Sequence, residues 1–340
     1  MQNRKIKIYS DKKYLTQENH EVILFPFWGK NKIELENEIG GQFDDFITNG
    51  HKYFELTPVE DCDFVVLPEN YNHERLPEYH SIISLAKNFN KPILIFYCND
   101  SDAKIRIDNA IIFRTSLYKN NREKNEFPLP AWSEDFLQKY NNGNLNIKHK
   151  KLIPTISYCG YTKTLKDYIK DLLQIDYGCW RPLRHEAIKT LKNDKNIYKK
   201  FIIRNDFFGG AYKNNFSDKE KIKIVRKEYA ENLITGEYAL ATRGRGNFSY
   251  RFYEIFNSGK IPVFINTDCV LPYEKFIAYK NYVVWLEDSE VKNINHLLLD
   301  FHNKIGQEDF INLQKEIREI WEEWFSPDGF FKHFYLHFNL

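Results

Sequence analysis

Several features that define common protein classes are scarce or absent in this 340-residue chain. Its five cysteines are Cys62, Cys98, Cys159, Cys179 and Cys269, an odd and scattered set without a C-x-x-C pair. This spacing argues against a disulfide scaffold or a zinc site, and for reduced thiols. The N-terminal residues lack the apolar core of a signal peptide, and no apolar run reaches the roughly 20 residues of a membrane span. We therefore expect a cytoplasmic protein with no integral membrane segment, while peripheral association with a membrane stays open.

The chain also lacks an excess of charge of either sign. Its 49 Lys and Arg residues nearly balance 47 Asp and Glu residues, which leaves a formal net charge of +2. Bulk attraction to nucleic acid is therefore not expected, and any affinity for anions must come from a local cluster. The ten histidines show no metal-ligand spacing, and neither a serine-hydrolase elbow nor a kinase motif set occurs.

Apolar runs that alternate with amphipathic segments predict an α/β fold with parallel, doubly wound sheets. Apolar residues make up 42% of the chain, enough for two domains with their own cores. A polar stretch at 137–151 marks the boundary, so we expect an N-terminal domain at 1–145 and a C-terminal domain at 146–340. Strands are expected at 5–9, 21–25, 63–67, 92–97, 109–113, 152–159, 199–204, 238–241, 261–265 and 282–286. Helices are expected at 31–47, 77–89, 180–192, 218–234, 247–258, from 290 onward, and at 308–325.

One stretch, residues 237–272, concentrates the chemistry. It predicts a strand, a glycine-rich turn, a helix and a second strand, the order of a βαβ unit. The turn brings Arg243 and Arg245 to a helix N-terminus, which suits a phosphate or diphosphate. Arg251 and Glu254 lie three residues apart on one face of the helix, beside that turn. The alternative to a phosphate-binding turn is a surface turn whose arginines are solvated.

The same stretch carries a family motif. R-G-x-G-x-x-S-x-R-x-x-E, followed by G-x-I-P-V and L-P, resembles the signature of the exostosin-like glycosyltransferases. The residues that carry it are Arg243, Gly244, Gly246, Ser249, Arg251, Glu254, Gly259, Ile261, Pro262, Val263, Leu271 and Pro272. The resemblance is weaker at 156–160 and 63–68, and Lys260 stands where the family often has Cys. It implies an inverting GT-B enzyme whose two Rossmann-like domains face a cleft, with a C-terminal helix that could cross back to the first domain. In such an enzyme the domain at 1–145 would be the acceptor side and the domain at 146–340 would bind the nucleotide-sugar.

Ligands of open α/β sheets bind beyond the carboxyl ends of the strands. On that rule and on the resemblance, the nucleotide-sugar site is expected to comprise Gly160, Arg184, Arg204, Arg243, Gly244, Arg245, Gly246, Asn247, Ser249, Arg251 and Glu254. Arg204 resembles a diphosphate contact of the family, Glu254 is expected to accept ribose hydroxyls, and Arg251 is expected to act in catalysis. Ser249 could instead cap the helix.

Inversion at an anomeric carbon needs a base that deprotonates the acceptor hydroxyl. The candidates at strand ends of the first domain are Glu69, Asp100 and Asp102. Asp100 and Asp102 also form an Asp-x-Asp triplet, which could hold Mn²⁺ or Mg²⁺ in a metal-dependent transferase. An arginine-lined diphosphate site makes a metal unnecessary, so no metal and no other cofactor is expected.

Together with the resemblance, the sequence therefore predicts an inverting glycosyltransferase that moves a sugar, with a UDP-sugar favoured as the donor, to a hydroxyl of a glycan or glycolipid acceptor in surface polysaccharide synthesis. Three alternatives stay open. The turn from Gly244 to Gly246 is a near-match to a dinucleotide fingerprint, which with Asp268 would indicate a nicotinamide-dependent oxidoreductase. The other two are a metal-dependent transferase using Asp100 and Asp102, and a non-catalytic binding module without a working base.

Overall fold

The computed structural model describes residues 4–36, 40–162, 180–212 and 218–338. The chain divides into two compact units. The first comprises Met1–Glu134, Asp268–Tyr273 and Glu322–Leu340, and the second comprises Asp135–Thr267 and Glu274–Trp321. The chain thus first passes from one unit to the other between Glu134 and Asp135, before the expected boundary at residue 145. The C-terminal segment belongs to the first unit, as expected for a chain end that crosses back.

A six-stranded parallel sheet, in the order β2-β1-β3-β4-β5-β6, forms the first unit. Its strands are β1 (Ile6–Tyr9), β2 (Phe54–Leu56), β3 (Phe64–Val66), β4 (Ile93–Tyr97), β5 (Ala110–Arg114) and β6 (Glu126–Pro128). Its helices are α1 (Phe25–Trp28), α2 (Lys32–Glu36), α3 (Asp44–Asn49), α4 (His80–Asn88) and α12 (Pro327–Lys332). Every residue of β4 is buried, as expected of a central parallel strand that is covered on both faces.

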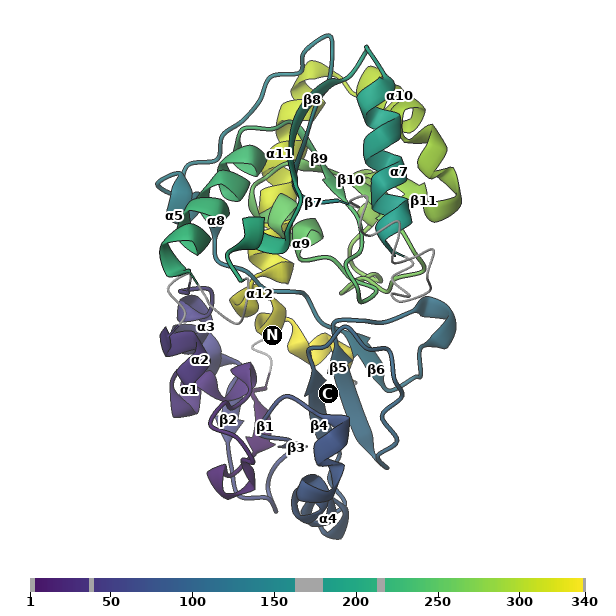
Figure 1. Cartoon of the computed structure of the whole chain (residues 1–340). Helices are drawn as coiled ribbons and strands as arrows, with labels where there is room; N and C mark the ends of the chain where they lie inside the picture. Colours follow the sequence, from purple (N-terminus) through teal and green to yellow (C-terminus); the bar gives the residue numbers. More distant parts are fainter. Residues whose placement is uncertain (1–3, 37–39, 163–179, 213–217, 339–340) are drawn as a thin grey trace. The chain divides into compact units, whose positions relative to one another are not determined.

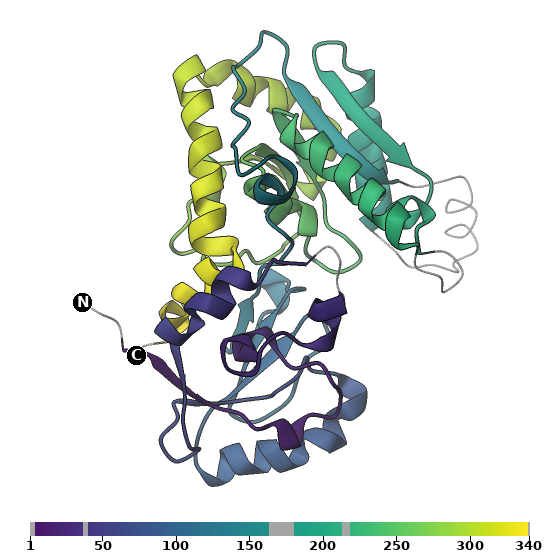
Figure 2. The same ribbon diagram turned by 90° about the vertical axis from the view of Figure 1, so that its left-hand side faces the viewer.

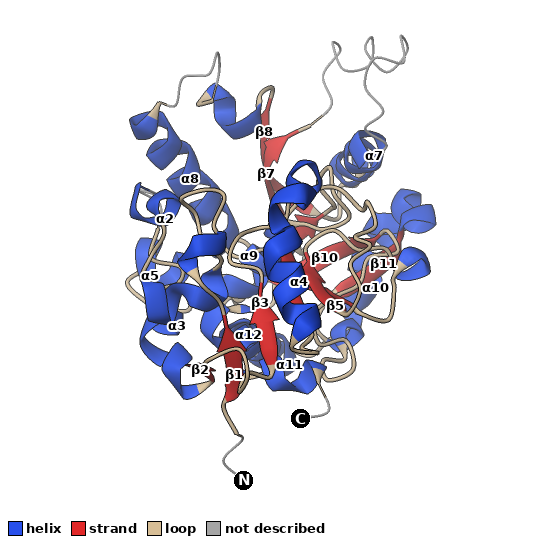
Figure 3. Ribbon diagram, turned by 90° about the horizontal axis from the view of Figure 1, so that it is seen from below, coloured by secondary structure: helices blue, strands red, loops and turns tan. Residues whose placement is uncertain are grey.

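Helices cover this sheet with apolar side chains. Ile82 and Ala86 of α4 join the core cluster of Ile93 and Ile95, and Figure 3 shows α4 against the strands. A second aromatic layer is built by the returning C-terminal segment. There Phe331 of α12 stacks on Phe46 of α3, with ring centroids 4.2 Å apart. The C-terminal segment is therefore part of the core of the first unit.

Two expectations for the first unit were wrong. Residues 21–25 are not a strand: a 3-10 turn at Val22–Leu24 leads into α1, with Pro26 in the first helical turn. Proline is favoured there because it lacks the backbone N–H, which in the first turn of a helix would have no helical partner. This local preference outweighs the strand-like apolar run. The helix expected at 31–47 consists of the separate helices α2 and α3, and Gly41, at φ +98°, lies between them. The short strands β2 and β6 were not predicted.

The second unit is a five-stranded parallel sheet in the order β11-β10-β9-β7-β8. Its strands are β7 (Thr155–Tyr161), β8 (Tyr198–Arg204), β9 (Tyr238–Ala241), β10 (Ile261–Asn266) and β11 (Val284–Glu287). Its helices are α5 (Phe136–Tyr140), α7 (Trp180–Asn193), α8 (Lys219–Ile234), α9 (Tyr250–Asn257), α10 (Ile294–Lys304) and α11 (Gln307–Ile320). Figure 1 shows α7 and α10 on one face of this sheet and α8, α9 and α11 on the other. In Figure 2, α11 is the long yellow helix of this unit.

Both sheets reverse their strand order once. The reversal falls between β1 and β3 in the first unit and between β7 and β9 in the second. Such a switch point opens a crevice outside the carboxyl ends of the two strands, and open α/β sheets bind ligands there. The prediction of two Rossmann-like α/β domains is confirmed, and each sheet has one crevice where a ligand is expected.

Candidate functional site

The predicted βαβ unit is present at the switch point of the second sheet. β9 and β10 pair in parallel from Tyr238↔Ile261 to Ala241↔Phe264, and α9 connects them. Phe252, Ile255 and Phe256 are buried along one side of α9 and fix this helix on the sheet. The turn before α9 is closed by the Gly244 N–H, which donates to the Phe248 carbonyl oxygen at 2.8 Å. The N-terminus of α9 therefore faces the crevice beside the end of β7.

Arg251 lies at this switch point, on α9 and against β7. Its Nη2 donates to the Cys159 carbonyl oxygen at 2.8 Å and its Nε to the Tyr229 hydroxyl at 3.3 Å. The guanidinium also stands over the Tyr158 ring, 4.4 Å from its centroid. Among the described residues, no carboxylate lies within ion-pair distance of Arg251. Neutral groups thus hold a partly buried cation in place, and no residue of the described ranges gives it a direct counter-charge.

Gly160 leaves room for this arginine. It has φ +155°, and a Cβ at this position would lie 2.7 Å from Arg251 Nη2. A side chain at residue 160 would therefore both strain the backbone and displace the guanidinium.

We expect Gly160→Ala to lower the free energy of unfolding by about 1–3 kcal/mol, because of the backbone strain and the contact with Arg251. Gly244→Ala is the matched control. Its Cβ would meet only the Phe248 carbonyl oxygen, at 3.7 Å, and its φ is not positive. Urea denaturation of the two variants measures the difference. Equal stability of both variants would contradict the assigned packing.

Arg184 joins the end of β7 to the turn after β9. Its Nε donates to the Thr242 hydroxyl at 3.0 Å, and its Nη1 and Nη2 donate to the carbonyl oxygens of Tyr161 and Arg243 at 3.3 and 2.9 Å. Burial lowers the pKa of Arg184, and the positive charge of Arg251 acts in the same direction. Two guanidinium groups are therefore close enough to repel each other, and a bound anion would relieve that repulsion.

Glu254 lies behind Arg251 in a buried network. Its Oε1 accepts from Arg226 Nη2 at 2.7 Å and its Oε2 from the Tyr229 hydroxyl at 2.5 Å, with 3% of the residue exposed. The same Tyr229 hydroxyl accepts the Arg251 Nε–H, and burial, followed by the Glu254 charge, raises the pKa of Tyr229. Both carboxylate oxygens thus have protein partners. This arrangement favours an orienting role for Glu254 over the expected contact with ribose.

The remaining predicted site residues lie around this centre with different partners. Arg204 ends β8 and pairs with Glu228 of α8, with Nη2 and Oε2 2.5 Å apart. Asn247 is buried behind the turn and accepts from the Thr267 hydroxyl at 2.7 Å. Ser249 precedes α9, and its hydroxyl makes no capping hydrogen bond, so the capping alternative is not supported.

The turn itself presents both buried and exposed groups. Arg243 is partly buried and donates from Nη2 to the Arg245 carbonyl oxygen at 2.9 Å. Arg245 is exposed, whereas Gly246 is buried. Two contacting pairs therefore form the site, Gly160 with Arg251 and Arg184 with Arg243, while Arg245 is exposed on the turn.

Asp268, the acid that the nicotinamide-dependent oxidoreductase alternative requires, makes other contacts. Asp268 belongs to the first unit, where its Oδ2 accepts the Asn120 N–H at 3.0 Å and its carbonyl oxygen accepts the Lys119 N–H at 2.7 Å. An acid that binds the ribose of a dinucleotide must keep its carboxylate available for the two hydroxyls. These contacts disfavour the oxidoreductase alternative.

The three predicted base candidates differ in environment. Glu69 is fully buried and accepts from the N–H groups of Thr16 and Gln17, the Thr16 hydroxyl and the Tyr79 hydroxyl. Protein donors thus occupy both oxygens of this carboxylate, which argues against a base role. Asp100 and Asp102 are exposed in the loop after β4. In the described part of the chain, no three His, Cys, Asp or Glu side chains come together in a way that could hold a metal ion.

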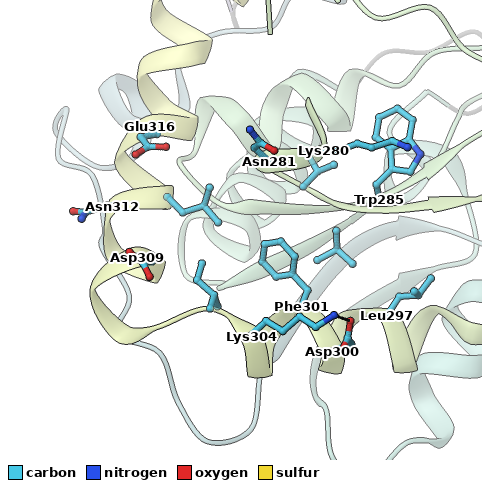
Figure 4. A pocket seen from close by; sticks show the side chains of 14 residues that line it. Lys280, Asn281, Trp285, Leu297, Asp300, Phe301, Lys304, Asp309, Asn312 and Glu316 are labelled. Carbon is cyan, nitrogen blue, oxygen red and sulfur yellow. Dashed lines mark hydrogen bonds and ion pairs between the residues drawn. The ribbon is translucent and has the colours of Figure 1, made fainter. Parts of the chain in front are cut away.

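A separate hollow of about 600 Å³ lies at the edge strand β11, between α10 and α11. Figure 4 shows Trp285 and Phe301 at this hollow, with Asp300 and Lys304 paired at 2.6 Å (Oδ2–Nζ). It includes none of the predicted site residues. Its size alone does not make it the functional site, because the clustered arginines and the switch point are found elsewhere.

Several residues of the site were not predicted. Tyr158, Tyr229 and Arg226 hold Arg251 and Glu254 in place, and Thr242 holds Arg184. Arg226 and Tyr229 are three residues apart on α8 and therefore share a face of that helix. That spacing was the only sequence signal, and it does not reveal that the face turns toward α9.

No helix in the described residues is both long and apolar enough to cross a lipid bilayer.

Residues 180–301, which include the βαβ unit, match the Exostosin GT47 domain. The chain is 25% identical to Exostosin-1a of Danio rerio over 292 residues, which cover 82% of this chain and 38% of that protein. It is 27% identical to Exostosin-1 of Drosophila melanogaster over 113 residues, covering 33% of this chain and 14% of that protein. The chain thus spans well under half the length of these relatives.

A solved glycosyltransferase from Rickettsia africae is 12% identical, with a TM-score of 0.45 and 98% of each chain covered. The domain match and the exostosin relatives include the segment whose R-G-x-G-x-x-S-x-R-x-x-E motif carries the resemblance. The resemblance to the exostosin-like glycosyltransferases is confirmed over this segment.

Proposed function

We propose that this protein is an inverting glycosyltransferase that binds a UDP-sugar at the crevice between β7 and β9. The observation that carries the proposal is the environment of Arg251. This guanidinium is positioned by Cys159, Tyr158 and Tyr229, and no carboxylate of the described residues neutralises it. Burying a charge without an opposite charge is costly, so the missing partner is an anionic ligand. A sugar diphosphate supplies that charge.

The second unit would stabilise the leaving group. The dipole of α9 favours negative charge at its N-terminus, where Arg251 lies in the first turn. Arg184 contributes a second guanidinium, and Arg243 stands in the adjoining turn. As the bond between the anomeric carbon and the diphosphate oxygen breaks, negative charge grows on the diphosphate, and fixed guanidinium groups bind it more tightly.

The chemistry of an inverting transfer sets what the acceptor must be able to do. In an inverting transfer, an acceptor hydroxyl attacks the anomeric carbon opposite the diphosphate and must lose its proton. We propose a glycan or glycolipid hydroxyl as the acceptor and synthesis of a surface polysaccharide as the setting. The similarity to the exostosin relatives agrees with sugar transfer as the reaction class.

Thermal unfolding with nucleotides tests the donor class. A ligand that binds the folded protein raises its melting temperature by mass action. UDP, GDP and NAD⁺ are compared at the same concentration, and a panel of UDP-sugars is then assayed for UDP release. The proposal expects the largest shift with UDP and release of UDP from at least one sugar donor. Stabilisation by NAD⁺ alone would favour the oxidoreductase, and binding of UDP-sugars without any turnover would favour the non-catalytic module.

We expect chelation by EDTA to leave the rate of UDP release within about twofold of its value without chelator. Guanidinium groups neutralise the departing diphosphate in place of a metal ion. Initial rates with excess EDTA, followed by addition of Mn²⁺ or Mg²⁺, measure the effect. Loss of activity that Mn²⁺ restores would instead support the metal-dependent alternative through Asp100 and Asp102.

A further inference from the structure

Exposed apolar side chains lie together at the amino ends of two paired strands of the second unit. Leu152 and Ile153, shortly before β7, are 94% and 45% exposed, and Tyr198, the first residue of β8, is 63% exposed. The Tyr198 N–H donates to the Pro154 carbonyl oxygen at 2.8 Å, and Tyr198 pairs in register with Thr155. Single exposed apolar residues are common on proteins, but three on adjacent strand ends indicate an interaction surface.

Lysines surround these apolar side chains. The segments 146–153 and 194–200 contain six lysines and a single acid, Asp194. The lysines are Lys148, Lys150, Lys151, Lys195, Lys199 and Lys200. Figures 1 and 2 show the loop before β7 and the turn between α7 and β8 at the same end of the second unit. Burial lowers the pKa of Lys148, and the charges of Lys200 and Lys151 act in the same direction, so lysines of both segments are close enough to repel each other.

The acids beside these lysines are held by other groups. The Asp194 carboxylate accepts from the Asn295 side-chain amide and from the Asn196 N–H, both at 2.8 Å. Glu237 is only 1% exposed, and it accepts the Thr155 N–H at 2.7 Å and pairs with Lys151. Six lysines against these two acids leave the surface positively charged.

We propose that this surface docks on an anionic lipid bilayer. We call it the amino-end patch, and it consists of Leu152, Ile153, Tyr198 and the six lysines. The apolar side chains would enter the boundary between headgroups and acyl chains, while the lysines around them attract anionic headgroups. A nucleic acid would pair with the lysines but would leave Leu152 and Ile153 in water. The inference goes beyond the proposed transfer reaction and does not rest on it.

Helix α8 of the same unit provides a contrast. Its Ile224 is 68% exposed, but the lysines near it have acidic partners on the same helix. Lys223 pairs with Glu220 at 3.1 Å and Lys227 with Glu231 at 3.8 Å (Nζ–Oε1 in both). A single apolar side chain among paired charges lacks the features of the amino-end patch, so these residues serve as matched controls.

The amino-end patch and the nucleotide crevice lie at opposite ends of the same strand. β7 begins at Thr155 beside the patch, and seven residues later it ends at Tyr161, next to the Gly160 that accommodates Arg251. At the usual rise of a strand this separates the two ends by roughly 20 Å. Docking through the patch would therefore leave the crevice open to a nucleotide in solution.

Co-sedimentation of the full chain with lipid vesicles tests the charge of the patch. Vesicles of phosphatidylglycerol and phosphatidylcholine in equal parts are compared with vesicles of phosphatidylcholine alone. We expect binding to the anionic vesicles that weakens as NaCl is raised, and at least about tenfold weaker binding to the neutral ones. Lys150→Glu combined with Lys195→Glu should lower the affinity for anionic vesicles at least about tenfold. The control, Lys223→Glu combined with Lys227→Glu, makes the same change in net charge and should stay within about twofold of the parent.

Leu152→Ser tests the insertion of an apolar side chain. It should lower the affinity for anionic vesicles by about fivefold or more, whereas Ile224→Ser should leave that affinity unchanged. Melting temperatures of all variants, measured without vesicles, show whether each protein is folded. Hydrogen–deuterium exchange of the parent provides a readout that needs no substitution. With anionic vesicles, exchange should slow in peptides that cover residues 146–155 and 193–200.

Four results would overturn the docking surface. The first is no binding to anionic vesicles, or equal binding to neutral ones. The second is an equal loss of affinity in the patch variants and in the α8 controls. The third is protection by vesicles that excludes both peptides of the patch. The fourth is binding to double-stranded DNA that is tighter than binding to vesicles and unaffected by Leu152→Ser, which would assign the lysines to nucleic acid.

Discussion

Replacing Arg251 with lysine should lower turnover by about 10² to 10³-fold while the protein stays folded. The guanidinium uses Nη2 for the Cys159 carbonyl, Nε for the Tyr229 hydroxyl and its flat face for the Tyr158 ring. A lysine ammonium is a point charge without this fork or this plane, so it cannot keep these contacts and also bind diphosphate oxygens. The loss should fall mainly on turnover, because the charge on the diphosphate is greatest in the transition state.

Rates of UDP release, UDP affinity from calorimetry and circular dichroism would be measured for Arg251→Lys and for the surface control Arg106→Lys. Arg106 is exposed in the first unit, so its substitution should change none of these quantities. A folded Arg251→Lys protein with near-parental turnover would show that Arg251 is merely structural. An equal loss of UDP affinity and turnover would assign it to ground-state binding instead.

Glu254→Ala should destabilise the protein by about 3–5 kcal/mol, since it removes the carboxylate that pairs with the mostly buried guanidinium of Arg226. Arg226 is 12% exposed at its side chain and pairs with Glu254 at 2.7 Å (Nη2–Oε1). Tyr229 would also lose the acceptor of its hydroxyl group. A loss of this size is a large share of the 5–15 kcal/mol that typically stabilises a domain.

Urea denaturation would compare Glu254→Ala with Glu231→Ala as the matched control. Glu231 forms a surface pair with Lys227 on α8, with 55% and 65% of the side chains exposed, so its loss should cost under about 1 kcal/mol. The expected result is a large difference between the two variants. If Glu254→Ala kept its stability but lost UDP affinity, the original expectation of a ribose contact would be supported and the orienting role rejected.

The parts of the fold that local patterns determine could be predicted. β4 is an uninterrupted apolar run, and α9 carries a helical stripe through Phe252, Ile255 and Phe256, so both were expected close to where they lie. The turn at Arg243 and the position of Gly160 at a strand end followed from the same reasoning. The strand predicted at residues 21–25 was wrong because proline at the second position of α1 favours a helix start, and this preference outweighed an apolar run that also suits a strand.

What could not be predicted depends on contacts between residues far apart in the sequence. Nothing in the sequence near Glu254 indicates that Arg226 of α8 would pair with it or that Tyr229 would donate a hydrogen bond to it. Glu69 and Glu21 are both acids beside apolar segments, and only the fold distinguishes the carboxylate with several donors from the one with a single weak hydrogen bond. Burial and partners, which set the pKa of a carboxyl group, are properties of the folded chain.

Hydrogen–deuterium exchange with and without UDP tests most directly whether the β7–β9 crevice holds the nucleotide. Backbone amides that a ligand covers or orders exchange more slowly. The account predicts slower exchange with UDP in peptides that cover residues 158–161 and 242–254, and unchanged exchange at the hollow beside β11. Unchanged exchange in both of those peptides, or protection confined to residues 280–316, would contradict it.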